Sequence, residues 1–222
     1  MTVDVQTISR NLAAVRRRIQ AAGGDVDRVA IVGVTKTLSV EVVRNAVDAG
    51  IRSVGENYAK ELVGKVIEVA QDRDEGRRRP RWHFIGQLQT NKVKMLAPYV
   101  DVWHTVDSLR IVGEIAKRQP DARIFVQVNA TDDERRGGCR WEDLDDIVDL
   151  AEQRGLVVQG LMGVGPHGEA EGSRAFFRRL VRESKARGYA DVSCGMSGDF
   201  EVAVEEGATV LRLGSVLFGQ RG

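Results

Sequence analysis

A lysine stands directly after the apolar segment 29–35, which reads VAIVGVT. In an extended strand Val32, Val34 and Lys36 share one face, because successive side chains point to opposite sides. A lysine on an apolar interior face would be partly desolvated, which lowers its pKa into the range where an amine forms Schiff bases near neutral pH. Lys36 is therefore a candidate amine nucleophile. The alternative interpretation is a solvated lysine at the end of a strand.

Two glycine and serine turns occur near the C-terminal end of the sequence. Ser197 and Gly198 lie in the segment CGMSGD, and Gly214 and Ser215 lie in the segment RLGS. Each turn follows a predicted strand and precedes a predicted helical turn, so its backbone N–H groups and hydroxyl could bind an anion such as a phosphate. The alternative is that both turns only close tight loops.

Arg212 alternates with Leu211 and Leu213 in the predicted last strand. If the two leucines pack against helices, the arginine side chain points to the other face of the strand, into the sheet's interior. A buried guanidinium needs a partner, because an unpaired buried charge is costly. That partner could be a carboxylate of the interior or an atom of a ligand, and the sequence leaves both open.

These residues are positioned by a regular alternation of short apolar segments and amphipathic helices. Several of the apolar segments are rich in Val and Ile without strict alternation, which is typical of parallel strands buried on both faces. We predict eight strands, beginning at Val29, Ile51, Trp82, Asp101, Arg123, Val157, Asp191 and Thr209.

Eight successive strand and helix units predict an α/β fold, either a closed (β/α)8 TIM barrel or a doubly wound open sheet. The barrel is favoured, because the first strand lacks the G-x-G-x-x-G turn of nucleotide-binding open sheets. Apolar residues at helical spacing between Val5 and Ile19 predict an extra N-terminal helix, which could close the barrel's bottom or pack on its side. Ser39 and Ser108 are predicted helix N-caps.

Composition narrows the classes of protein that this chain could belong to. The 222 residues carry 33 Lys plus Arg against 32 Asp plus Glu, so no basic surplus favours nucleic-acid binding. No apolar run approaches the roughly 20 residues of a membrane-spanning helix, and the N-terminal segment lacks the apolar stretch of a secretory signal. We expect one domain over residues 1–222, located in the cytoplasm.

The remaining chemically active side chains fit no catalytic or metal-binding pattern. Cys139 and Cys194 lie far apart without ligand spacing, so we expect reduced thiols and no metal site. His83 and His104 lie within predicted strands and are interpreted as core or rim histidines. The arginine-rich run 77–81 follows several acidic residues and is interpreted as a self-neutralised loop rather than an RNA site.

Several longer motifs occur together through nearly the whole chain. They make the sequence similar to the pyridoxal phosphate homeostasis protein family (YggS/PROSC type). The motifs are VTKT around Lys36, GENY from Gly55, WHFIGQLQTNK from Trp82, GLMGV from Gly160, CGMSGDFEVAV from Cys194 and RLGSVLFG from Arg212.

The resemblance implies a barrel of the alanine racemase N-terminal-domain type that binds pyridoxal 5′-phosphate (PLP) as an internal aldimine with Lys36. It implies that Arg212 lies near the pyridine nitrogen and Asn57 beside the ring. The phosphate would be bound by the residues of the two turns, namely Ser197, Gly198, Gly214 and Ser215.

The chain departs from the family pattern in ways that bear on this reading. A carrier role that needs a second Schiff-base lysine in the loop after Asn129 would not be served by an arginine at position 136. The departures are Leu38 in place of a lysine, Asp133 and Arg136 in place of Glu and Lys, Gly163 and Ser215 in place of threonines, and Cys194 in place of a methionine.

The resemblance implies intracellular PLP homeostasis, in which the protein holds PLP and releases it to apoenzymes. Catalytic turnover and catalytic residues are not expected, because an arginine at the ring nitrogen disfavours the protonated pyridinium that carbanion chemistry uses. The resemblance also implies that alanine racemase has a second domain, which supplies a further acid/base. We expect no such domain here, because no residues follow Gly222. We expect a monomer. A small PLP-dependent racemase and a cofactor-free Schiff-base aldolase remain the alternatives.

Overall fold

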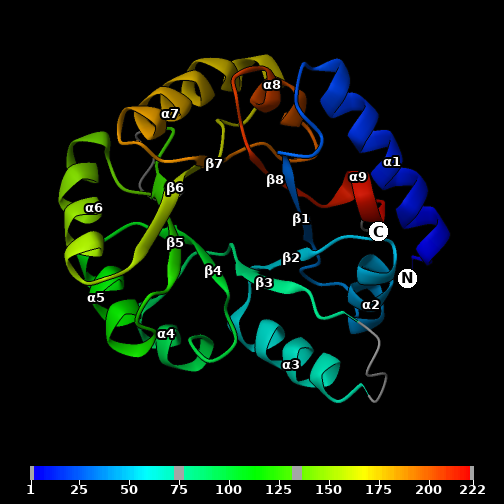
Figure 1. Cartoon of the computed structure of the whole chain (residues 1–222), viewed down its shortest axis with the longest axis horizontal. Helices are drawn as coiled ribbons and strands as arrows, with labels where there is room; N and C mark the ends of the chain where they lie inside the picture. Colours follow the sequence, from blue (N-terminus) through cyan, green and yellow to red (C-terminus); the bar gives the residue numbers. More distant parts are fainter. Residues whose placement is uncertain (1–2, 73–77, 132–136, 221–222) are drawn as a thin grey trace.

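The strands form a closed, all-parallel barrel (Figure 1). The structure is a computed structural model and describes residues 3–72, 78–131 and 137–220. Strand β1 pairs with β8 as well as with β2, which closes the ring and confirms the predicted (β/α)8 barrel over the open sheet. The strands are β1 (Ala30–Val34), β2 (Ser53–Glu56), β3 (Arg81–Phe84), β4 (Val102–Val106), β5 (Arg123–Val128), β6 (Val157–Gly163), β7 (Asp191–Ser193) and β8 (Val210–Leu213).

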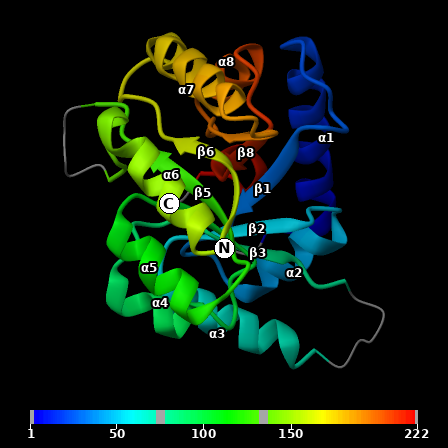
Figure 2. The same cartoon turned by 60° about the vertical axis from the view of Figure 1, so that its left-hand side comes forward.

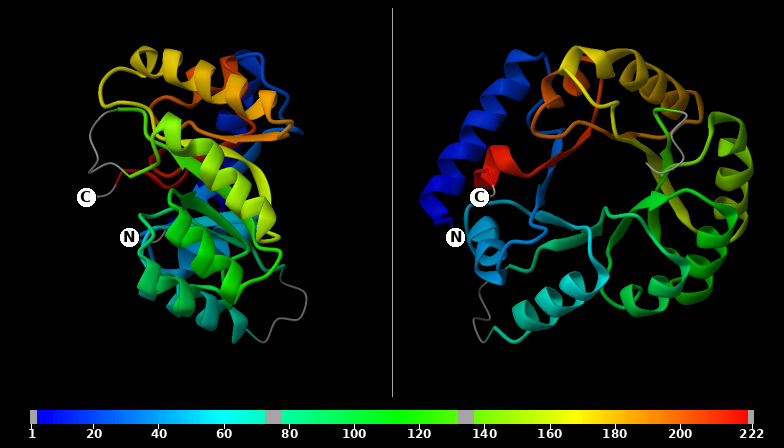
Figure 3. Two further views of the ribbon diagram at one scale, coloured as in Figure 1. Left: turned by 90° about the vertical axis from the view of Figure 1, so that its left-hand side faces the viewer. Right: turned by 180° about the vertical axis from the view of Figure 1, so that it is seen from behind.

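The helices surround the barrel and bury their apolar faces against it (Figure 3). Ser39 and Ser108 occupy the predicted N-cap positions of α2 and α5, although neither hydroxyl makes a capping hydrogen bond. The helices are α1 (Val5–Ala21), α2 (Val40–Asp48), α3 (Ala59–Ala70), α4 (Thr90–Leu96), α5 (Leu109–Arg118), α6 (Leu144–Gln153), α7 (Arg174–Ala186), α8 (Phe200–Glu205) and α9 (Ser215–Phe218), with single 3₁₀ turns η2 (Trp141–Asp143) and η3 (Ala170–Ser173).

The extra N-terminal helix packs on the side of the barrel rather than across its bottom (Figures 1 and 2). Asp4 caps this helix, α1, by accepting a hydrogen bond from the Thr7 amide at 2.8 Å. Asn11 of α1 donates to the carbonyl oxygen of Leu217 in α9 at 2.8 Å, and Arg18 pairs with Glu201 of α8 at 2.5 Å. The helix is therefore fixed to the two short helices that follow the last two strands.

The apolar core has two parts, separated by the wall of the barrel. The larger part lies between the strands and the surrounding helices. The smaller part fills the barrel's interior, and its buried members among the described residues are Val32, Val102, Phe125, Met162 and Val210. Polar side chains occupy the interior beside this small cluster, toward the carboxyl ends of the strands.

The structure also describes the two cysteines and part of the arginine-rich loop. Cys139 and Cys194 are buried free thiols, as predicted. Asp72, which precedes the arginine-rich run, pairs with Arg44 of α2 at 2.7 Å, and residues 73–77 of that loop lie outside the described part of the chain. Among the described residues, no helix is long and apolar enough to cross a membrane, and no group of ligating side chains forms a metal site.

Candidate cofactor-binding site

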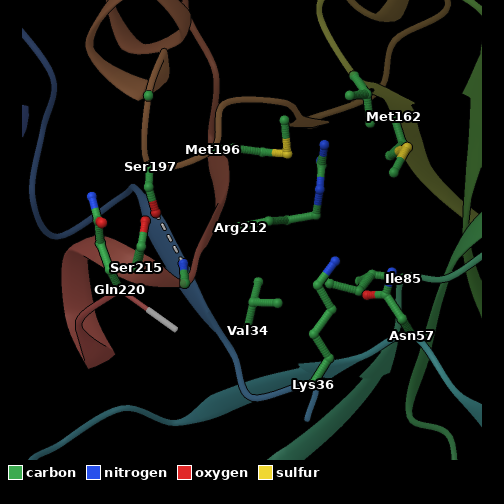
Figure 4. Close-up of a pocket in the computed structure, with 13 residues that line it drawn as sticks. Val34, Lys36, Asn57, Ile85, Met162, Met196, Ser197, Arg212, Ser215 and Gln220 are labelled. Carbon is green, nitrogen blue, oxygen red and sulfur yellow. Dashed lines mark hydrogen bonds between the residues drawn. The ribbon is translucent and has the colours of Figure 1, made fainter. Parts of the chain in front are cut away.

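A cavity of about 690 Å³ lies at the carboxyl ends of the strands, the face that carries functional residues in barrels of this class. Figure 4 shows the side chains of Lys36 and Arg212 pointing into this space. All seven residues predicted from the sequence line it, namely Lys36, Asn57, Ser197, Gly198, Arg212, Gly214 and Ser215.

Lys36 reaches the cavity because of the alternation of side chains along β1. Val32 belongs to the interior cluster, Val34 lines the cavity and Lys36 follows on the same face, as the sequence predicted. Lys36 and Thr37 are the central residues of a turn closed by a 3.0 Å hydrogen bond from the Leu38 amide to the Thr35 carbonyl oxygen. The lysine is half-buried at the mouth of the barrel.

Arg212 is a buried cation whose hydrogen-bond partners are all neutral. It is only 3% exposed. Its Nη1 donates to the Ser193 carbonyl oxygen at 2.8 Å and to Ser193 Oγ at 2.6 Å, and its Nη2 donates to the Gly163 carbonyl oxygen at 2.8 Å. No carboxylate of the described residues pairs with it, and burial lowers its pKa to about 10. The alternative of an interior ion pair is therefore not what the structure shows, and an anionic or lone-pair ligand would suit this guanidinium.

Gly163, which the resemblance gave as a departure from the family pattern, lies in a tightly packed place. A Cβ atom at this position would lie 2.5 Å from ring atoms of Phe176 in α7. The glycine lets α7 approach β6 closely, while its carbonyl oxygen accepts from Arg212 on the inner side.

The two strand histidines extend the polar network behind Arg212. Ser193 Oγ lies 3.0 Å from His104 Nδ1, and His104 Nε2 lies 2.8 Å from His83 Nδ1. Burial lowers the pKa of His83 to about 3 and that of His104 well below its ordinary value. Both rings are thus neutral and buried, which agrees with their interpretation as core or rim histidines, and they also link β3 and β4 to Ser193 of β7, the residue that accepts from Arg212.

The two predicted anion-binding turns lie side by side and are bonded to each other. Ser197 Oγ accepts from the amides of Gly214 at 3.1 Å and Val216 at 3.3 Å, and Figure 4 draws the first of these bonds. Within the described chain no hydrogen bond satisfies the amides of Gly198 or Ser215, and both residues are exposed and line the cavity. These two N–H groups can donate to an anion.

Asn57 follows β2 and supplies an unsatisfied acceptor beside the lysine's side of the cavity. Its Oδ1 atom is buried and has no hydrogen-bond partner. The backbone of Asn57 approaches the segment after β3 so closely that a Cβ atom on Gly86 would lie 2.0 Å from the Asn57 carbonyl oxygen. The glycine that ends the WHFIG motif therefore permits the placement of Asn57.

The chemistry available to the cavity follows from its lining. An amine, a buried guanidinium without a salt-bridge partner among the described residues, and unsatisfied amides suit a ligand that combines an electrophile with an anionic group. The lining residues from the described chain include no carboxylate and no histidine. Sequence reasoning missed the apolar walls and one polar residue, which are Val34, Ile85, Met162, Val164, Met196 and Gln220. Met196 could have been found from its place in the CGMSGD turn.

Comparisons with known proteins identify the family of the chain. The sequence profile of the alanine racemase N-terminal domain matches residues 3–222. A protein named pyridoxal phosphate homeostasis protein from Aquifex aeolicus is 36% identical, covering 97% of both chains. The protein of the same name from Pseudomonas aeruginosa is 37% identical, over 98% of this chain and 97% of its own.

Solved structures of other proteins have the same fold as this chain. PipY of Synechococcus elongatus, solved with PLP bound, is 28% identical with a TM-score of 0.82, over 96% of this chain and 100% of its own. Alanine racemase from Bartonella henselae shares the fold, with a TM-score of 0.72 at 13% identity, over 99% of this chain and 60% of its own. The chain therefore belongs to the alanine racemase N-terminal domain family and, within it, to the pyridoxal phosphate homeostasis proteins.

Proposed function

We propose that this protein binds PLP covalently through Lys36, holds it without catalytic turnover, and releases it to apoenzymes as part of PLP homeostasis in the cytoplasm. The observation that carries the proposal is a single cavity that combines Lys36 with the buried cation of Arg212, whose hydrogen-bond partners are all neutral. The names of the relatives and the PLP-bound PipY structure support the same ligand.

The residues of the cavity fit the groups that PLP carries. Bound PLP supplies a reactive aldehyde, a pyridine ring and a phosphate. Lys36 would provide the amine, and the exposed amides of Gly198 and Ser215 would donate to the phosphate. Arg212 would donate to the ring nitrogen from the strand between these groups, and the unsatisfied Oδ1 of Asn57 would accept a hydrogen bond from the ligand or from a bound water.

The same lining supports a carrier rather than an enzyme. A racemase removes a proton on one face of its substrate and returns one on the other, so it needs a second acid/base besides the lysine. The described lining residues offer no carboxylate, histidine or tyrosine for that role. Arg212 also disfavours a protonated ring nitrogen, because two positive charges a few ångströms apart repel each other.

The first test is the visible spectrum of the purified protein incubated with PLP, followed by borohydride reduction and peptide mass analysis. We expect visible absorbance and a reduced label on Lys36. Lys36→Ala should abolish both while leaving the unfolding transition in place, because this half-buried side chain contributes little to packing. Lys60→Ala, which replaces an exposed lysine of α3, is the matched control. A colourless protein, or a label mainly on Lys60, Lys92 or Lys94, would contradict the assignment.

The second test separates a carrier from an enzyme. The loaded protein is mixed with a PLP-dependent apoenzyme, and recovery of the apoenzyme's activity is compared with recovery in free PLP at the same concentration. We expect transfer from the loaded protein and none from the Lys36→Ala protein after desalting. Rapid exchange of the α-hydrogen of alanine by the loaded protein would instead favour the racemase alternative.

A further inference from the structure

The backbone that carries Lys36 has an unusual conformation at the next residue. Thr37 has a φ of 62°, in the left-handed region that residues with a Cβ atom seldom adopt. It is the third residue of the hydrogen-bonded turn that runs from Thr35 to Leu38. A positive φ at this position of a turn usually calls for glycine or asparagine. A threonine there persists only where surrounding contacts hold it.

Those contacts come from the outer side of the barrel, from α3. Glu61 accepts a hydrogen bond from the Thr37 amide at 2.6 Å. Lys65, one helical turn later, donates to the same Glu61 oxygen at 2.6 Å and to the Thr35 carbonyl oxygen at 2.7 Å. Of the two residues that flank Lys36, Thr37 is therefore bonded to Glu61 and Thr35 is bonded to Lys65.

A third charged residue anchors this pair to the barrel wall. Glu56, at the end of β2, is fully buried and accepts from Lys65 at 2.7 Å and from the Thr35 hydroxyl at 2.6 Å. Lys65 itself is only 7% exposed. Burying charged groups is costly, so a buried salt bridge is weak evidence for stability. Stability alone therefore does not explain the triplet of Glu56, Glu61 and Lys65.

We propose that Glu61 and Lys65 are positioning residues, which hold the strained turn 35–38 so that the Lys36 amine points into the cavity. The inference rests on the proposed function, since it treats Lys36 as the residue that binds PLP. Glu61 and Lys65 belong to α3, on the outer side of the barrel, and neither side chain lines the cavity. Glu61 and Lys65 bond the backbone of the two neighbours of Lys36, and Glu56 bonds the side chain of Thr35.

The test uses Glu61→Ala, because the Glu61 side chain is 22% exposed and its truncation leaves Lys65 paired with Glu56. The readouts are the rate of formation of the borohydride-trapped Lys36 adduct and the dissociation constant for PLP from the visible spectrum. Loss of a charge-assisted hydrogen bond should make binding weaker and adduct formation slower by about tenfold. Lys60→Ala, the neighbouring exposed residue, should match the parent.

Two further variants separate positioning from a general loss of structure. Thr37→Gly adopts a positive φ without strain. Added to Glu61→Ala, it should bring binding back to within about threefold of the parent. Glu61→Gln keeps an acceptor for the Thr37 amide and should lose less than Glu61→Ala. Parent-like binding by Glu61→Ala, or no recovery in the folded double variant, would overturn the proposal.

A measurement without PLP keeps the two proposals distinguishable. Hydrogen exchange of the Thr37 amide, followed by NMR, should be about tenfold faster in Glu61→Ala than in the parent, because the amide loses its acceptor. Unchanged exchange would overturn the positioning role whatever the ligand. A parent protein that forms no trapped adduct would overturn the proposed function, while the exchange result would still decide whether Glu61 holds the turn.

Discussion

The buried histidine pair makes stability depend on pH, and His83→Asn tests this. The pKa of His83 is about 3 in the folded chain, against an ordinary value of 6.5, because burial disfavours the charged ring. Below pH 6.5 the unfolded chain binds a proton that the folded chain does not bind. The contribution to stability is therefore fully present above pH 6.5 and is lost as the pH falls toward 3.

The size of the effect follows from the same values. A pH of 5 lies about 1.5 units below the pKa of His83 in the unfolded chain, and each unit corresponds to about 1.4 kcal/mol. Protonation of His83 in the unfolded chain should therefore lower the free energy of unfolding by about 2 kcal/mol between pH 7 and pH 5. His104, whose pKa is also lowered by burial, adds to the loss. Glu56 and Asp107 act in the opposite direction, because burial raises their pKa values.

The assay is urea unfolding at pH 7 and pH 5, for the parent and for His83→Asn. The variant keeps a polar group near His104 but has no imidazole to protonate, while the contributions of the other titrating groups largely cancel in the comparison. We expect the variant to be less stable at pH 7 and to lose about 2 kcal/mol less than the parent on acidification. Equal losses in the two proteins would refute the assignment of a buried neutral ring at His83.

Three other predictions concern the cavity and its supports. In Arg212→Glu protein that still binds PLP, α-hydrogen exchange of bound alanine should rise above the parent's, and equal rates would show that the ring-nitrogen partner does not control the chemistry. Gly163→Thr should cost about 1–3 kcal/mol in urea unfolding, because its Cβ overlaps the Phe176 ring, and an unchanged midpoint would refute the overlap. Ser197→Ala should weaken PLP binding about tenfold in a spectral titration, because the Gly214 amide loses its acceptor, and unchanged affinity would contradict the proposed phosphate site.

Side-chain periodicity predicted the barrel and the direction of its key residues. Alternation within single strands predicts the directions of Lys36 and Arg212, and both residues line the cavity. The outcome was predictable because a strand's two faces are fixed by its own sequence, whatever lies across the barrel. The roles of these residues toward PLP remain predictions for the experiments above.

Contacts between distant strands were not predictable in the same way. The link from His104 to Ser193 joins residues 89 positions apart, and no local pattern marks it. Glu61 and Lys65 stand four residues apart on α3, a spacing that is also typical of a solvent-exposed ion pair. Their burial depends on how α3 packs over the end of β1, which only the folded structure shows. The loop positions Asp133 and Arg136 lie outside the described residues.

The closure of the barrel sets the order in which a newly made chain can acquire its ligand site. Lys36 leaves the ribosome well before Arg212 and the turn at Ser215, because it precedes both in the chain. Strand β1 cannot pair with its second neighbour until β8 has been synthesised, and α1 cannot bond to Glu201 and Leu217 until those residues have been synthesised. A nascent chain that still lacks β8 therefore holds the amine without the cation, and any premature reaction of its lysine with an aldehyde would take place outside a formed cavity.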